Sequence, residues 1–328
     1  MSTVSGRTCP LRYRYHPRTL RDCPETASQT LYVIGGLYGN LPALRAIEAM
    51  AAAEAGPLTL CFNGDFNWFN SDPAGFAAIN AAVLRHDACQ GNVEAELYAP
   101  GDEAGCGCAY PEAVDAGVVE RSNAIHARLK QTAQLYPEIL QQLETLPMVR
   151  RYRVGTATVG VVHGDAESLA GWRFDITALD DPANQDWLGH AFKQAGVDIF
   201  ASSHTCLPVL RRFEVNRAEK LIVNNGAAGM PNLHGSQHGI ITRIARTRSP
   251  HEALYGARLK TLYVDALAVC YDQSAWERDF LANWPAGSPA YESYFSRIHH
   301  GTEHAVAQAF QGSAIIATGG DISPSRRW

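Results

Sequence analysis

The sequence predicts an α/β fold, because short apolar runs of strand length alternate with longer segments whose apolar residues recur at helical spacing. Five of these runs lead directly into a loop rich in glycine and polar residues. In open α/β sheets, ligands and catalytic groups gather where such strands end. The polar residues that follow the strands are therefore the first candidates for a functional site.

The chain opens with residues 1–30, which carry five arginines before the first acidic residue, Asp22. Without an apolar h-region this segment does not have the pattern of a secretory signal, and we expect a solvated N-terminal extension. A strand is predicted at 30–34, followed by the glycine-rich loop 35–39 and a helix from Leu41. The loop has neither the dinucleotide fingerprint nor a P-loop lysine, so a nucleotide-binding fold is not favoured.

The next predicted strand, 58–62, runs into Asn63-Gly64-Asp65 and is followed by a helix at 73–85. A short strand at 87–90 leads to Gly91-Asn92. From 95 to 147 the pattern is helical and amphipathic, and we interpret this segment as an inserted cap that shapes the substrate pocket or forms a homo-oligomer contact.

Strand patterns resume after the insert, and beyond residue 239 the sequence pattern is more typical of antiparallel strands. Strands are predicted at 157–162, 197–201, 221–223, 239–247 and 261–272, and a helix at 276–284. We expect a core of 31–246 that contains the insert, and a C-terminal part, 247–328, of strands and helices packed on that core.

Composition narrows the function. A net charge of −5 and a pI near 6.2 argue against a dedicated nucleic-acid binder, and no apolar run reaches the length of a membrane span. The eight cysteines have no zinc-ribbon spacing, which predicts a reduced, cytoplasmic protein. Cys106 and Cys108 form the one close pair, and we interpret them as buried or idle thiols.

Four polar residues at strand ends suit a borderline divalent metal such as Mn, Fe or Zn. They are Asp65, Asn92, His163 and His204, with Asn224 nearby. Taken one at a time, the aspartate and the histidines could have purely structural roles, because Asp is a good helix N-cap and a buried histidine is often only hydrogen-bonded. Two histidines and an aspartate, all after strands and beside Gly or Ser, favour the metal site.

The order of the loop motifs resembles that of the calcineurin-like metallophosphoesterases, most closely a small bacterial phosphodiesterase-like branch. The blocks are GGLYGN, NGDFN, GNVE, VVHGD, SSHTC and NNGAAG, and they span about residues 31–246. The resemblance implies a four-layer α-β-β-α sandwich, in which two mixed β-sheets are flanked by helices and the metals lie at the strand ends.

The sequence departs from the family pattern at four of these positions. The family has Asp-x-His, Asn-His and Gly-His-x-His, where this chain has Gly36 and Tyr38, Val93, and Cys206. The resemblance thus implies that the first metal's own ligands are vacated at Gly36, Tyr38 and Cys206. It also implies that the second metal keeps its full set, Asp65, Asn92, His163 and His204.

The predicted function is therefore a metal-dependent hydrolase, a phosphoesterase of a small phosphorylated substrate that uses one divalent ion. One ion can polarise a phosphoryl oxygen and lower the pKa of a bound water. Val93 cannot transfer the proton that the family's histidine transfers, so Tyr38, Asp165 and Glu94 are candidate replacement acids, with Tyr38 and Asp165 as the catalytic assignment. Substrate binding is assigned to Asn40, Asn225 and Gly226, with the N–H groups of 225–229 as an anion cradle.

Two alternatives stay open at this point. One is a non-catalytic metal-binding or regulatory protein on the same fold. The other is a mononuclear iron enzyme of another reaction class, because Asp65, His163 and His204 form a set of two histidines and one carboxylate. Basic residues that could bind phosphate are Arg121, Arg150, Arg151, Arg211 and Arg212.

Overall fold

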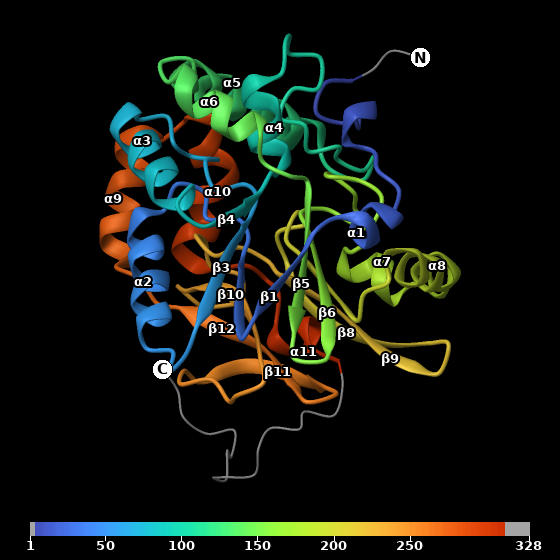
Figure 1. Ribbon diagram of the computed structural model, residues 1–328. Coiled ribbons are helices and arrows are strands. Elements are labelled where there is room, and N and C mark those ends of the chain that lie inside the picture. The colour runs from blue at the N-terminus through green and yellow to red at the C-terminus, as the bar shows by residue number, and fades with distance from the viewer. Residues whose placement is uncertain (1–3, 312–328) are drawn as a thin grey trace.

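In a computed structural model, which describes residues 4–311, the chain forms two six-stranded mixed sheets that lie face to face between helices (Figure 1). The strand orders are β11-β12-β10-β2-β3-β4 and β1-β5-β6-β7-β9-β8. Each sheet combines parallel and antiparallel pairs. This is the predicted α/β sandwich of four layers, and the prediction is confirmed.

The first sheet has a parallel half and an antiparallel half. β2 (Thr30–Ile34), β3 (Leu58–Asn63) and β4 (Asp87–Cys89) run parallel, and β10 (Gly239–Ala245) joins them antiparallel through β2. β12 (Leu262–Val269) and β11 (Ala253–Leu259) complete the sheet beyond β10. Its outer face is covered by α2 (Leu41–Ala52), α3 (Pro73–Val83) and α9 (Gln273–Asn283).

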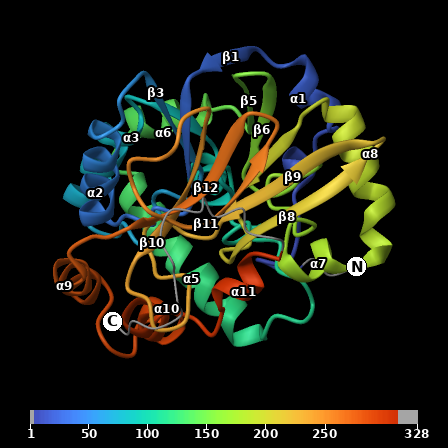
Figure 2. The same cartoon turned by 90° about the horizontal axis from the view of Figure 1, so that it is seen from below.

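The second sheet is built around two parallel strands, β6 (Ala157–Val162) and β7 (Ile199–Ser202). The remaining strands are β1 (Glu25–Ser28), β5 (Val149–Val154), β8 (Pro208–Val215) and β9 (Ala218–Asn225). Helices α1 (Arg18–Asp22), α7 (Ile176–Asp180) and α8 (Gln185–Ala195) cover its outer face. Seen from below, α2 and α3 lie on one side of the paired sheets and α8 on the other (Figure 2).

Three apolar clusters hold these layers together. One lies between the sheets and includes Val33, Val159 and Ile244, because strands buried on both faces carry apolar residues on both. The other two lie between each sheet and its helices and include Ile47 on α2 and Phe192 on α8. Each boundary between neighbouring layers of the sandwich is thus filled by its own apolar cluster.

The predicted helical insert lies over the carboxyl ends of the strands (Figure 1, top). It consists of α4 (Asn92–Tyr98), α5 (Ala116–Ala133) and α6 (Pro137–Glu144), so it begins slightly before residue 95. α10 (Pro289–His300) packs on α5, and α11 (Val306–Ala309) lies beside β8. The predicted role of the insert in a homo-oligomer stays a prediction.

The structure adds detail on both sides of the predicted core. Residues 247–328 were expected to be strands and helices packed on the core, and β11 and β12 are strands of the first sheet itself; residues 312–328 lie outside the described part. The N-terminal segment was expected to be solvated, and much of it is exposed, but Tyr13 and Leu20 are fully buried and β1 pairs with β5. Leu20 packs on Gly160 of β6, where a Cβ would come within 3.2 Å of its methyl groups.

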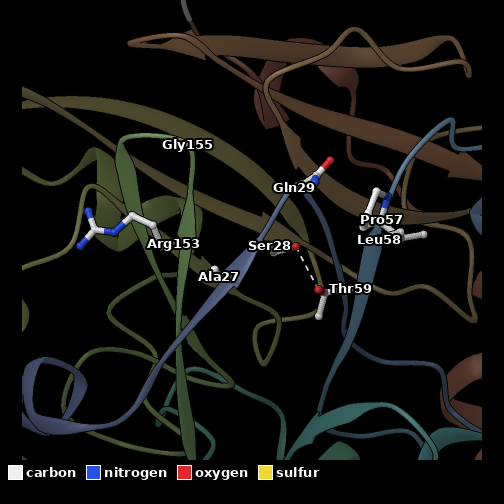
Figure 3. Close-up of a pocket in the computed structure, with 8 residues that line it drawn as sticks. All are labelled: Ala27, Ser28, Gln29, Pro57, Leu58, Thr59, Arg153 and Gly155. Carbon is white, nitrogen blue, oxygen red and sulfur yellow. Dashed lines mark hydrogen bonds between the residues drawn. The ribbon is translucent and has the colours of Figure 1, made fainter.

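A groove of about 380 Å³ lies between the edges of the two sheets, at the opposite end from the polar strand ends. Ser28 and Gln29 of the β1–β2 connection face Pro57 and Thr59 across it, and the Ser28 hydroxyl donates to or accepts from that of Thr59 at 3.0 Å (Figure 3). Within residues 4–311, no helix is long and apolar enough to cross a membrane.

If the N-terminal segment is part of the core, Leu20→Ala should lower the free energy of unfolding by about 2–5 kcal/mol, the usual cost of a cavity at a fully buried leucine. Leu11→Ala is the matched control, because Leu11 is 88% exposed and should change stability little. Urea unfolding of both variants provides the measurement. Equal stability of the two would contradict the packing of α1.

Candidate metal centre

The structure brings together the four predicted metal ligands, two from each sheet. Asp65 and Asn92 follow β3 and β4 of the first sheet, and His163 and His204 follow β6 and β7 of the second. Nε2 of His163 lies 3.3 Å from Asp65 Oδ1, 3.2 Å from Asn92 Oδ1 and 3.3 Å from Nδ1 of His204. Asp65, His163 and His204 offer atoms within 4.8 Å of one another, the spacing of a metal site.

Backbone carbonyls hold a nitrogen of three of the four ligands. Nδ1 of His163 lies 2.8 Å from the carbonyl of Asn63, and Nε2 of His204 lies 3.0 Å from that of Cys108. The Asn92 amide nitrogen donates to the carbonyl of Cys106 at 2.9 Å. A carbonyl can only accept, so each of these nitrogens carries a proton and the remaining lone pairs face the centre. Such outer contacts orient metal ligands.

Asp65 is held in place by an unusual turn. Gly64 and Asp65 both have left-handed backbone angles, with φ of 76° and 53°. The Glu94 carboxylate accepts from the N–H groups of Asp65, Phe66 and Asn67 at 2.7, 3.1 and 3.3 Å, which stabilises the turn. Only glycine fits at position 91, because a Cβ there would lie 2.2 Å from Asp65 Oδ1.

The cluster is buried and its charges are coupled. Burial alone would raise the pKa of Asp65, but His163 beside it brings that pKa below its usual value. Burial opposes the His163 imidazolium, yet the Asp65 carboxylate raises the His163 pKa overall. Burial and the neighbouring His163 lower the pKa of His204 to about 3. Without a metal, a proton is therefore held at His163, where a divalent cation would replace it.

Glu94 carries the second carboxylate near this centre. Burial and then the charge of Asp65 raise its pKa to about 7. Its two oxygens accept from the backbone of the Asp65 turn and from the N–H of Gly91 at 3.1 Å. We therefore revise its interpretation from a replacement acid to a residue that positions Asp65.

The three positions that the sequence predicts to be vacated first-metal ligands also lie together. The Tyr38 hydroxyl is 2.9 Å from Cys206 Sγ, and a Cβ on Gly36 would lie 2.8–2.9 Å from the Tyr38 ring and hydroxyl. All three residues have left-handed φ angles, of 56°, 59° and 64°. The Tyr38 ring thus occupies the space that a side chain at position 36 would need. Burial and Cys206 raise the pKa of Tyr38, which keeps its phenol neutral.

The catalytic assignment of Asp165 is not supported by its contacts. Its carboxylate accepts from the backbone N–H groups of Glu167, Ser168 and Arg173, at 2.9, 3.1 and 3.2 Å. Burial raises its pKa, and these contacts oppose that shift. Asp165 therefore organises its own loop.

The predicted substrate-binding residues serve the backbone as well. Asn40 caps α2 through Ala43 N–H and donates to the carbonyl of Gly229 at 2.9 Å. Asn225 donates to the carbonyls of Gly35 and Ile240, both at 2.9 Å. The N–H of Gly226 donates to Asn224 Oδ1 at 2.8 Å.

The anion cradle is occupied in the same way. The N–H groups of Ala227, Ala228 and Gly229 donate to Asn232 and to the carbonyls of Gly35 and Gly36. The predicted cradle is thus replaced by a cross-link between the two sheets, because its donors already have internal acceptors.

Three contributions to the site escaped sequence reasoning. Trp172 lies edge-on to His204, with ring centres 5.2 Å apart, and its Nε1 donates to the carbonyl of Cys108 at 3.0 Å. The carbonyls of Cys106 and Cys108 belong to the main chain and have no residue signature. Arg297 of α10 donates to the carbonyl of Cys206 at 2.8 Å. The sequence analysis missed this contact because Arg297 lies far along the chain from the predicted ligands.

The five arginines that could bind phosphate by sequence form contacts with other side chains of the protein. Arg150 and Arg151 pair with Asp87 and Glu25. Arg211 pairs with Asp180 and Arg212 with Glu219. Arg121 donates to the hydroxyl of Ser293 at 2.7 Å.

Comparison with solved structures identifies the fold. A metallophosphoesterase from Sphaerobacter thermophilus matches 83% of this chain and all of its own, with a TM-score of 0.53 and 17% identity. A hypothetical protein from Pyrococcus horikoshii OT3 matches 84% of this chain and 99% of its own, with a TM-score of 0.55 and 15% identity. No family model and no curated protein matches the sequence. The likenesses confirm the predicted metallophosphoesterase fold.

Asp65→Asn should abolish metal retention, because within residues 4–311 Asp65 is the only carboxylate grouped with the two histidines. The amide keeps the acceptor for Val93 N–H, which Asp65 Oδ1 bonds at 3.2 Å, and thus preserves the turn better than Asp65→Ala. Elemental analysis of purified protein is the measurement, with Asp186→Ala at an exposed position as the control. Equal metal content in Asp65→Asn, Asp65→Ala and wild type would sink the single-site interpretation.

Restoring the family ligands tests the vacated positions. Gly36→Asp alone should destabilise the protein, since its Cβ meets the Tyr38 ring and φ is 64°. The triple variant with Tyr38→His and Cys206→His removes the ring and supplies three donors, so metal content should rise from one ion to two. A folded triple variant that still binds one ion, or a wild type that already binds two, would contradict the assignment.

Proposed function

We propose that this protein is a metal-dependent hydrolase of phosphoesters that uses one divalent ion. The observation that carries the proposal is the convergence of four lone-pair donors, from Asp65, Asn92, His163 and His204, whose other polar atoms are held by the protein. Acceptors this close together need a positive charge among them, which a proton on His163 supplies without metal and a bound cation would supply in its place. The metallophosphoesterase fold supports the reaction class.

The residues present fit such an ion. Imidazole and carboxylate ligands suit Zn, Mn or Fe, and Asn92 adds a neutral oxygen. When bound, a divalent ion at this position would polarise a phosphoryl oxygen and favour ionisation of a water. The single negative charge of Asp65 leaves the loaded centre cationic, which favours an anionic substrate.

Tyr38 is the proposed proton donor. Its backbone N–H donates to the carbonyl of Asp65 at 3.1 Å, so the loop that carries it runs beside the metal centre. A neutral phenol can donate a hydrogen bond to a substrate oxygen, whereas Val93 offers no proton. Arg297 lies behind it and contributes positive charge through its contact with Cys206.

One observation favours a second candidate. Asp65, His163 and His204 alone form a metal group, which is the ligand set of non-heme iron enzymes. Oxygen consumption by protein loaded with iron(II) would reveal this chemistry. A protein that retains metal but shows neither reaction would be the non-catalytic alternative.

Removal of the metal should abolish phosphoester hydrolysis, and its return should restore it. Because the folded pKa of His163 lies above its ordinary value, protons compete with the cation to a higher pH than for an ordinary histidine. Metal retention and hydrolysis should therefore both fall as the pH is lowered, and the fall should begin above the ordinary histidine pKa of about 6.5. Phosphomonoester and phosphodiester assays before and after chelation provide the test. Activity that survives chelation, with metal shown to be absent, would contradict the proposal.

A further inference from the structure

The candidate metal centre is closed to solvent. Asp65 is 6% exposed, Asn92 1%, His163 0% and His204 5%. A phosphoester has no route to these atoms until part of the roof moves. The roof above Asn92 and His204 is the loop of residues 102–111, between α4 and α5, which we call the lid.

The lid contacts the centre with its main chain. The carbonyls of Cys106 and Cys108 accept from Asn92 and His204, and the carbonyl of Cys108 also accepts from Trp172. Gly105, Gly107 and Ala109 have left-handed φ angles of 59°, 66° and 49°, so the lid is a series of tight turns. Displacement of this loop would uncover the ligands and also remove the acceptors that orient two of them.

The N-terminal segment of residues 4–15, which we call the strap, holds the lid down. Gly6 exchanges two backbone hydrogen bonds with it, from its N–H to the carbonyl of Ala104 and from the N–H of Tyr110 to its own carbonyl, both 3.0 Å. The guanidinium of Arg7 donates to the carbonyls of Pro111 and Val114, both at 2.6 Å. The planar guanidinium offers two donors in a fixed fork, which holds the two carbonyls in one geometry.

Asn123 of α5 joins the strap to the lid. Its amide nitrogen donates to the carbonyl of Ser5 at 3.1 Å, and its oxygen accepts from the N–H of Cys106 at 3.0 Å. The same residue thus touches the strap and the part of the lid whose carbonyl holds Asn92. Asn123 is thus one link between strap and metal ligand, beside the hydroxyl of Tyr13, which donates to the backbone carbonyl of Asn92 at 3.4 Å.

The other end of the strap holds the loop that carries Trp172. The N–H of Leu169 donates to the carbonyl of Tyr13 at 3.0 Å, and the Tyr15 hydroxyl donates to the carbonyl of Asp165 at 2.6 Å. Both loops that cover His204 are therefore fastened by one continuous segment. At the same end of the strap, the Arg12 guanidinium and the Tyr13 hydroxyl both donate to the Glu96 carboxylate of α4.

We propose that the strap keeps the lid closed over the metal centre and that its release admits ligands to the site. The identity of the ligand as a phosphoester rests on the proposed function, but the closure does not. The strap contains no strand of either sheet, so it can detach at its first residues without loss of the sandwich. A partner or condition that competes for Arg7 would then switch the site on.

Arg7→Ala in the full-length, metal-loaded protein tests the closure through the thiols of Cys106 and Cys108, which are buried beneath the strap. N-ethylmaleimide labelling, read by peptide mass spectrometry, reports how often the lid opens. Loss of two hydrogen bonds from a charged group should raise the labelling rate of both thiols about tenfold or more. Arg7→Lys should give a smaller increase, because it keeps the positive charge but lacks the planar fork that fits both carbonyls.

Controls within the chain separate lid opening from unfolding. Cys61 and Cys89 are buried between the sheets and should stay unlabelled, whereas the exposed Cys270 should react in every variant. Arg18→Ala removes a strap-independent arginine that pairs with Asp22 at the surface, and should leave Cys106 and Cys108 protected. Asn123→Ala is the second opening variant and should act as Arg7→Ala does.

The outcomes are distinct. Faster labelling of Cys106 and Cys108 together with faster phosphodiester hydrolysis supports both closure and the proposed function. Faster labelling without hydrolysis in any variant supports the closure and overturns the phosphoesterase proposal. Unchanged labelling in Arg7→Ala and Asn123→Ala, or labelling that rises equally at Cys61 and Cys89, overturns the closure whatever the activity.

Discussion

The contact between the Asp65 carboxylate and the His163 imidazole, 3.3 Å apart at the seam of the two sheets, is the constraint on which the site depends. A buried carboxylate is costly unless a cation faces it, and here either a proton on His163 or a divalent metal can do so. The turn of Asp65 is fixed by Glu94, and the ring of His163 is fixed by the carbonyl of Asn63. The surrounding residues thus hold the buried Asp65 carboxylate and the His163 ring in one fixed arrangement.

The same electrostatic argument applies to positions 36, 38 and 206. A carboxylate at position 36 without a cation would add a further buried negative charge near Asp65. Gly36 carries no charge, and the neutral ring of Tyr38 fills the volume beside it. Cys206 supplies a partner for the phenol at 2.9 Å. The three residues thus pack together without a buried charge.

Much of the fold could be predicted because the central strands are uninterrupted apolar runs; the strand predicted at 157–162 is β6 as found. β5 and β8 were missed because arginines interrupt their pattern, and their burial depends on distant partners such as Glu25 for Arg151 and Asp180 for Arg211. The metal ligands could be predicted because each directly follows a strand. Asp165 and Asn225 follow strands or lie at their ends too, but their polar atoms bond backbone groups, a choice that only the tertiary structure reveals.

The lid joins two requirements that oppose each other. Its carbonyls orient Asn92 and His204, so a bound cation should favour the closed lid, and by reciprocity the closed lid should favour the cation. A substrate, in contrast, needs the lid open. The Tyr38 ring fills the space that a side chain at position 36 would need. An ion held partly by its own cover would tie cation affinity to substrate access, and the proposed strap would set the balance between them.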